Sequence, residues 1–146
     1  MSLRTEVEKL IKSNGGTVEV ETPESSIILK ETEDGEGFVC TAGPAIYLYD
    51  KLDAMWELVK KCVDAKGYNY IYIGGNTTKA GYRYNPSIPL SKMSLNEVIA
   101  GTMFSGCEGK SLARWCNYIA PVLQAVGYGY REPANGAADA KFRVLK

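Results

Sequence analysis

Histidine is absent from all 146 residues of this chain. Its absence excludes a Ser-His-Asp triad, a Cys-His nucleophile pair and a histidine general base. Catalysis would therefore have to use carboxylates, lysine, tyrosine or a metal ion held by oxygen ligands. Since no complete catalytic motif is present, the sequence favours a protein that is not an enzyme.

Closely spaced cysteine pairs are also missing. The four cysteines are isolated from one another, and none belongs to a Cys-x-x-Cys motif: Cys40, Cys62, Cys107 and Cys116. Together with the lack of histidine, this argues against a tetrahedral zinc site. Carboxylates such as Glu19 and Glu21 are expected to form a solvated strand edge. We therefore expect no metal, no cofactor and free thiols, as in a cytoplasmic protein.

Long apolar segments are missing as well. No run approaches the roughly 20 residues that a membrane-spanning helix needs, and the charged segment Met1–Glu6 lacks the apolar core of a secretory signal. Hydrophobic residues make up 45% and charged residues 23% of the chain, which are values typical of globular proteins. With no repeat or long linker, residues 1–146 are expected to form a single globular domain without a membrane partner.

The clearest pattern in the chain is a helix followed by a strand. Apolar residues recur every three or four positions from Asp50 to Lys66, and Gly67 follows as a stop signal. Tyrosine then alternates with other residues over Tyr68–Ile73, which predicts a strand with Tyr68, Tyr70 and Tyr72 on one face and Asn69, Ile71 and Ile73 on the other. The run Ala80–Tyr84 is expected to pair with this strand as a hairpin.

The remaining elements follow from capping and periodicity. Helices are expected over residues 3–13, where Thr5 to Glu8 suggests a capping box, over 95–103, and from about Ser111, with a kink or break at Pro121. Strands are expected over residues 17–21, 26–30, 38–41, 128–131 and 141–145. The predicted fold is α+β, with a mainly antiparallel sheet of about five to seven strands, one central amphipathic helix and a C-terminal helical pair.

Tyrosines supply the first candidate site. Seven of the ten lie in three short runs, with Arg83 and Arg131 interleaved. If Ile71 and Ile73 face the core, the rings of Tyr70 and Tyr72 lie on the opposite face, and Arg83 is expected beside them because a buried unpaired guanidinium is costly. Such a face can stack bases or sugars and hold phosphates. The alternatives are a covered, core position for the rings or a protein interface.

A second candidate is an anion site near Lys110. The segment Gly109-Lys110-Ser111 matches the end of a phosphate-binding P-loop, but Phe104 stands where the first glycine is required. We therefore expect a simpler site, in which free N–H groups at a helix start act with Lys110, Ser111 and Arg114. A plain glycine-rich connection with a solvated lysine is the alternative.

Charge is divided unevenly along the chain. Residues 1–66 hold 13 acidic and 8 basic side chains, whereas residues 67–146 hold 4 acidic and 9 basic ones. The order helix, three strands, helix also occurs in double-stranded RNA-binding domains, but Asp50, Asp53 and Glu57 lie where such a domain carries lysines. These carboxylates would repel duplex RNA, so a nucleic-acid partner is not expected, although the sequence leaves it open.

These observations lead to one function hypothesis and one alternative. The first is a small non-enzymatic binding protein for a nucleotide-like or other anionic small ligand, with Tyr70, Tyr72 and Arg83 stacking and clamping it. In this hypothesis Lys110, Ser111 and Arg114 bind the phosphate. The alternative is a homo-oligomeric interaction module that uses the same tyrosine and arginine surface.

Overall fold

The chain folds as an α+β protein with two antiparallel sheets. The structure, a computed structural model, describes residues 2–21, 26–40, 45–74, 84–104, 116–132 and 140–146, and only the backbone of 116–118. The larger sheet has the order β1-β2-β3-β4 and consists of Thr17–Glu21, Ser26–Glu31, Gly37–Cys40 and Ile46–Leu48. The smaller sheet has the order β5-β7-β6 and consists of Tyr70–Tyr72, Lys141–Val144 and Gly129–Glu132.

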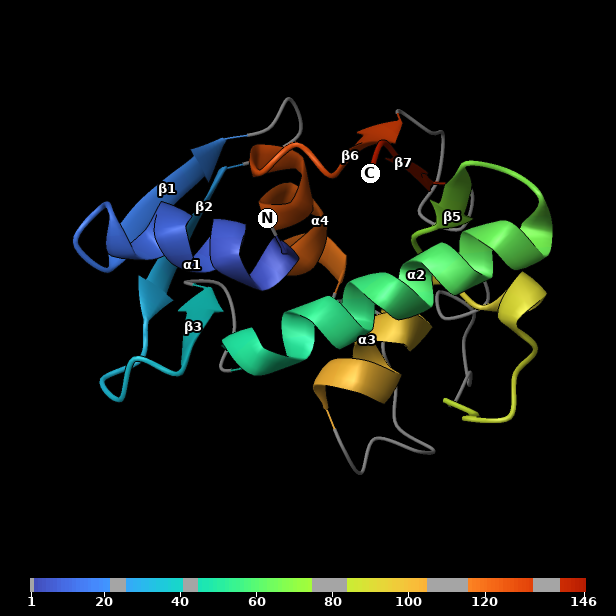
Figure 1. The fold of residues 1–146 in the computed structure, drawn as a ribbon, viewed down its shortest axis with the longest axis horizontal. Coiled ribbons are helices and arrows are strands. Elements are labelled where there is room, and N and C mark those ends of the chain that lie inside the picture. The colour runs from blue at the N-terminus through green and yellow to red at the C-terminus, as the bar shows by residue number, and fades with distance from the viewer. Residues whose placement is uncertain (1, 22–25, 41–44, 75–83, 105–115, 133–139) are drawn as a thin grey trace.

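Helices surround and separate these sheets (Figure 1). The α-helices are α1 (Leu3–Lys12), α2 (Leu52–Lys66), α3 (Leu95–Met103) and α4 (Cys116–Ala125). Two 3₁₀ turns, η1 (Tyr49–Lys51) and η3 (Leu90–Lys92), complete the described elements. Helix α1 contacts β1 and β2, α2 contacts α1, α3 and β5, and α4 touches both sheets through β1 and β6.

The α+β class is confirmed, and the seven described strands fall within the predicted number. They form two sheets, however, rather than the one sheet that the sequence suggested. The first four strands are neighbours in sequence and pair locally, whereas β5 pairs with the last strand, β7, after an interval that includes two helices. Most of the predicted hairpin strand Ala80–Tyr84 lies outside the described residues, and Tyr84 is buried and not part of a strand.

Helix ends agree with the sequence signals in most places. Helix α2 ends at Gly67, whose φ of +78° is the left-handed conformation that favours glycine. The capping box of Ser94 and Glu97 opens α3 as predicted. Helix α1 begins at Leu3 as predicted, but its N-cap is Ser2, so the predicted capping box of Thr5 to Glu8 is wrong. Of the predicted kink or break at Pro121, the break is wrong, because α4 continues to Ala125, and the kink stays a prediction.

A surface cluster of charged and polar side chains joins α1 to the larger sheet. The ammonium of Lys12 lies 2.9 Å from Oε2 of Glu31, and the hydroxyl of Tyr49 donates to the same oxygen at 2.7 Å. The hydrogen bond from Lys12, followed by that from Tyr49, lowers the pKa of Glu31. One carboxylate therefore connects α1, β2 and η1.

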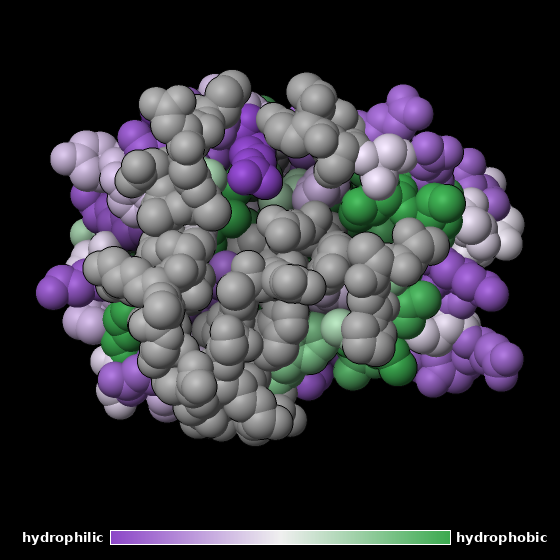
Figure 2. All heavy atoms as spheres, turned by 180° about the vertical axis from the view of Figure 1, so that it is seen from behind, coloured by the Kyte–Doolittle hydropathy of each residue, from purple (hydrophilic) through white to green (hydrophobic). Residues whose placement is uncertain are grey.

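The outer face of the larger sheet carries apolar side chains, with Ile28 39% and Ile46 50% exposed. Figure 2 shows the corresponding hydrophobic area at the end of the molecule that holds this sheet. Its inner face is closed by the core, where Leu29 and Phe38 are fully buried.

The smaller sheet is fixed by a buried pair on its inner face. Ile71 and Phe142 lie directly opposite each other on β5 and β7, and both are completely buried. A side chain at Gly129 on β6 would collide with the Phe142 ring and with the backbone carbonyl of Arg143. Glycine is therefore required at this position because of close packing.

Replacing Phe142 by alanine should lower the free energy of unfolding by about 3–5 kcal/mol, since it opens a cavity between β5, β6 and the core. Urea denaturation followed by circular dichroism measures this change. Phe142→Leu is the matched control and should cost clearly less, because it keeps most of the buried volume. Equal and small losses for both variants would contradict this packing.

Replacing Glu31 by glutamine should lower the free energy of unfolding at neutral pH. It should also make that free energy less sensitive to acid. Because the folded-state pKa of Glu31 lies below its usual value of 4.5, its carboxylate stabilises the fold above that value. This stabilisation is lost as the pH falls through the folded-state pKa, so the difference between the two proteins should shrink there. Urea midpoints between pH 7 and pH 3 test this, with the exposed Glu33→Gln as control; a constant difference would contradict it.

Candidate functional site

The outer face of the smaller sheet forms the candidate site. In the ladder, Tyr70 lies opposite Arg143 and Tyr72 opposite Lys141, so these side chains share one face. On the other side of β7, Tyr130 lies opposite Arg143 and Glu132 opposite Lys141. We call this surface the tyrosine face; it consists of Tyr68, Tyr70, Tyr72, Tyr130, Glu132, Lys141 and Arg143.

Three rings of the tyrosine face form a continuous row along the chain. The rings of Tyr68 and Tyr70 stack, with centroids 5.4 Å apart and planes 17° from parallel. The ring of Tyr72 meets Tyr70 edge to face at 5.5 Å. Tyr68 is 61% exposed, so the side of its ring that does not stack on Tyr70 is open to solvent.

Cations lie against these rings. The ammonium of Lys141 is 4.6 Å from the Tyr70 ring centroid and 5.8 Å from that of Tyr72. The guanidinium of Arg143 lies 5.1 Å from the Tyr70 centroid. The ammonium of Lys66, at the end of α2, lies 5.5 Å from the Tyr72 centroid. Cation–π attraction thus holds positive charge at the ring surfaces.

Arg143 is fixed in place by two further contacts. Its Nε donates to Oε1 of Glu132 at 2.5 Å, and its Nη1 donates to the side-chain oxygen of Asn69 at 2.7 Å. The hydrogen bond to Glu132 is the main reason why the pKa of Arg143 is raised. Its charge is therefore compensated, and its guanidinium serves to orient the neighbouring rings.

Lys141 differs from the other two cations. Within the described ranges it has no ion pair and no hydrogen bond from its ammonium, although it lies beside two rings. Lys66, by contrast, donates to the carbonyl of Met93 at 3.2 Å, and burial lowers its pKa. Lys141 is thus the cation of this surface that is best placed to meet an anion.

The structure bears on two of the six predicted site residues. Tyr70 and Tyr72 lie on the outer face, with Ile71 and Ile73 buried behind them, as the alternation predicted. Arg83, Lys110, Ser111 and Arg114 lie outside the described residues, so the predicted clamp and the predicted anion site near Lys110 stay predictions.

The sequence did not identify Lys66, Lys141 and Arg143 as site residues. The strand Lys141–Leu145 was recognised by its alternation, but nothing local shows that it lies beside Tyr70. The predicted tyrosine runs also differ in burial. Tyr130 is 42% exposed on the tyrosine face, whereas Tyr128 is buried. Burial is the main reason that the pKa of Tyr128 is raised to about 12.

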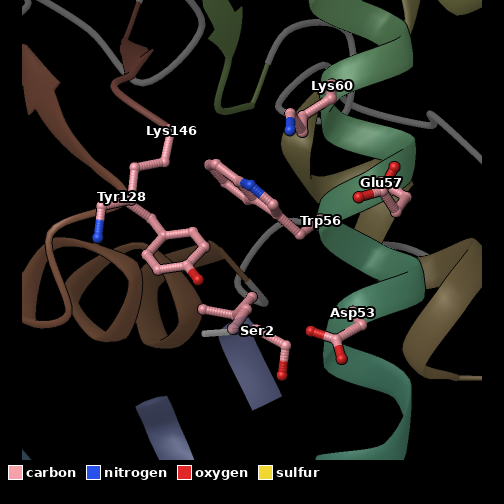
Figure 3. A pocket seen from close by; sticks show the side chains of 8 residues that line it. Ser2, Asp53, Trp56, Glu57, Lys60, Tyr128 and Lys146 are labelled. Carbon is pink, nitrogen blue, oxygen red and sulfur yellow. The ribbon is translucent and has the colours of Figure 1, made fainter. Parts of the chain in front are cut away.

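A separate cavity of about 440 Å³ lies between the start of α1, α2 and the C-terminal segment. Figure 3 shows the rings of Trp56 and Tyr128 in its wall, with their centroids 5.2 Å apart. Asp53 and Glu57 from α2 line the cavity together with Lys60 and Lys146. Two carboxylates accompany two ammonium groups, so this cavity has no preference for an anion.

Buried reactive groups have structural roles. Cys40 and Cys62 are free and buried, and burial raises the pKa of Cys40 to about 12, so its thiol stays protonated. The buried carboxylate of Glu97 accepts hydrogen bonds from the backbone N–H and hydroxyl of Ser94. Among the residues that the structure describes, no three Cys, Asp or Glu side chains gather in a way that could hold a metal ion.

Comparisons with protein-family models, curated proteins and solved structures find no match to this chain. In the described part of the chain, no helix is long and apolar enough to cross a membrane. Function must therefore be inferred from the geometry of the tyrosine face.

Proposed function

We propose that the tyrosine face binds a small anionic ligand with a flat ring, such as a nucleotide, without catalysing a reaction on it. The observation that carries this proposal is the position of the Lys141 ammonium, 4.6 Å from the Tyr70 centroid and without an acidic partner among the described residues. This cation and the exposed ring of Tyr68, which stacks on Tyr70, offer the two contacts that a nucleotide needs, one for phosphate and one for the base.

Each side chain has a distinct part in this binding. The ring of the ligand stacks on Tyr68, whose exposed ring already forms a stack with Tyr70. The phosphate meets Lys141, while Arg143, fixed by Glu132 and Asn69, keeps the Tyr70 ring oriented. Because these contacts exist before the ligand arrives, little ordering of side chains opposes binding.

Binding without catalysis fits the chemistry of this surface. Its carboxylate, Glu132, is already paired with Arg143. The chain has no histidine, and the buried thiol of Cys40 is protonated at neutral pH. The tyrosine face therefore supplies stacking and positive charge but no activated nucleophile or base.

Replacing Lys141 by alanine should weaken the binding of ATP by about 1–2 kcal/mol, the range for an exposed, charge-assisted contact. Tyr68→Ala should weaken it by about 1–3 kcal/mol through lost stacking. Isothermal titration calorimetry measures both. The control is Lys30→Ala, which removes an exposed lysine from the outer face of the larger sheet. Unchanged affinity in both variants, with melting temperatures preserved, would overturn the proposal, as would no binding of nucleotides at all.

A second candidate function is self-association through the same surface. It is favoured by the exposure of Tyr68 (61%) and Tyr130 (42%), because exposed tyrosines beside arginine are typical of interface hot spots.

If the second function holds, the protein should sediment as a defined oligomer at micromolar concentration, and Tyr68→Ala should shift it towards the monomer. Sedimentation velocity measures the shift, with Lys30→Ala again as the control. A monomer over the whole concentration range would contradict self-association and leave the ligand proposal standing.

A further inference from the structure

We propose that the tyrosine face, besides a single nucleotide, binds several consecutive nucleotides of a single-stranded nucleic acid. This inference rests on the proposed function and extends it from one base to several. It follows from the number, spacing and openness of the rings and from the cations between them.

More rings are present than one base can use. Tyr70 and Tyr72 alternate on β5, Tyr68 precedes the strand and stacks on Tyr70, and Tyr130 lies two strands away on the same face. Successive ring centroids in the row are 5.4 and 5.5 Å apart, and Tyr130 lies roughly 10 Å from β5, at twice the usual strand spacing. Rings over this extent can contact two or three bases, the number that aromatic side chains on RNA-binding sheets commonly stack.

The surface is also open. Small molecules are usually held in concave pockets that bury most of their surface. Tyr68 and Tyr130 are 61% and 42% exposed, so their rings are not enclosed. The described cavity lies elsewhere, between α1, α2 and Tyr128, and its mixed charges do not favour an anion. An extended polymer gains its contacts by crossing several rings, which an open sheet face permits.

Three cations lie along the row, and Lys141 is the one without an acidic or hydrogen-bond partner for its ammonium among the described residues. Arg143 and Lys141 lie over Tyr70, and Lys141 and Lys66 lie near Tyr72. The described acidic residue of the face, Glu132, is paired with Arg143. Residues 67–146 as a whole carry 9 basic and 4 acidic side chains. Lys141, with Lys66 beside the same Tyr72 ring, supplies positive charge that a phosphate backbone can meet.

Stacking on protein rings requires bases that are not already stacked in a duplex. Double-stranded RNA is recognised by its shape and by contacts to its sugars and phosphates, not by aromatic faces. The acidic side chains at the start of α2, which disfavour duplex RNA, belong to another part of the fold and do not oppose binding at β5 and β7. Every base offers an aromatic surface, so the expected recognition tolerates sequence differences.

The experiment measures affinity against length by fluorescence anisotropy, using labelled oligo-dT and oligo-rU of eight nucleotides. Thymidine and uridine monophosphates compete as the single-nucleotide probes, and a duplex of eight base pairs serves as the paired probe. We expect the oligomers to bind at least about tenfold more tightly than the monophosphates and the duplex. Comparison of the two oligomers shows whether the strand is DNA or RNA.

Variants locate the contacts. Tyr68→Ala should weaken oligomer binding roughly 5- to 150-fold, the equivalent of one lost base stack. Tyr130→Ala should also weaken oligomer binding, because Tyr130 lies on β6, two strands from β5, where a longer strand can contact it. For Lys141→Ala, the slope of log affinity against log salt should become shallower by about 0.7, the value for one phosphate contact on a single strand. Lys30→Ala is the control for each measurement.

The outcomes separate this inference from the proposed function. Equal affinity for monophosphates and oligomers would overturn the inference and leave the proposed function standing. Duplex binding as tight as single-strand binding would also overturn it. If neither monophosphates nor oligomers bind, both proposals fail. The length series uses the unaltered protein, so it decides the question even if a variant does not fold.

Discussion

The pairing of β5 with β7 is the constraint on which the candidate site depends. Ile71 and Phe142 are fully buried on the inner face, and this fixes the register of the ladder. A shift by one residue would expose Phe142 and direct Lys141 and Arg143 into the core, which is prohibitively costly for unpaired charges. The outer face is thus determined by the inner one: burial of two apolar side chains places rings and cations together in the only register that the core permits.

Local signals explain how much of this fold could be predicted. Apolar periodicity and Gly67 define α2, the capping box of Ser94 defines the start of α3, and alternation identifies the strands that became β1, β2 and β3. Partners that are distant in sequence could not be predicted in the same way. Tyr70 and Arg143 are adjacent on the sheet, but each is part of an alternating run that is compatible with many partners. For this reason the sequence suggested one sheet and placed the cation at Arg83, whereas the described face obtains its cations from Lys66, Lys141 and Arg143.

The two cations over Tyr70 differ in how firmly their side chains are held and in whether their charge is paired. Arg143 is held by Glu132 and Asn69, so its guanidinium is ordered and largely compensated. Lys141 has no such partner among the described residues and keeps its charge beside the same ring. An ordered cation keeps the aromatic row in a single arrangement, and a free one provides the attraction for an anion. This division resembles the general separation between groups that position a site and groups that contact the ligand.

The division of the fold into two sheets allows this arrangement without a large penalty in stability. The larger sheet and α1 supply much of the core and are joined by the Glu31 carboxylate, far along the chain from the tyrosine face. The smaller sheet needs only its inner face for folding, where Ile71 and Phe142 are buried against the core. Its outer side chains contact one another and the end of α2, while Tyr68 and Tyr130 stay exposed. Exposed tyrosines stabilise a strand through neighbouring contacts and β-propensity, so a surface rich in rings can be retained for binding while it still supports the sheet.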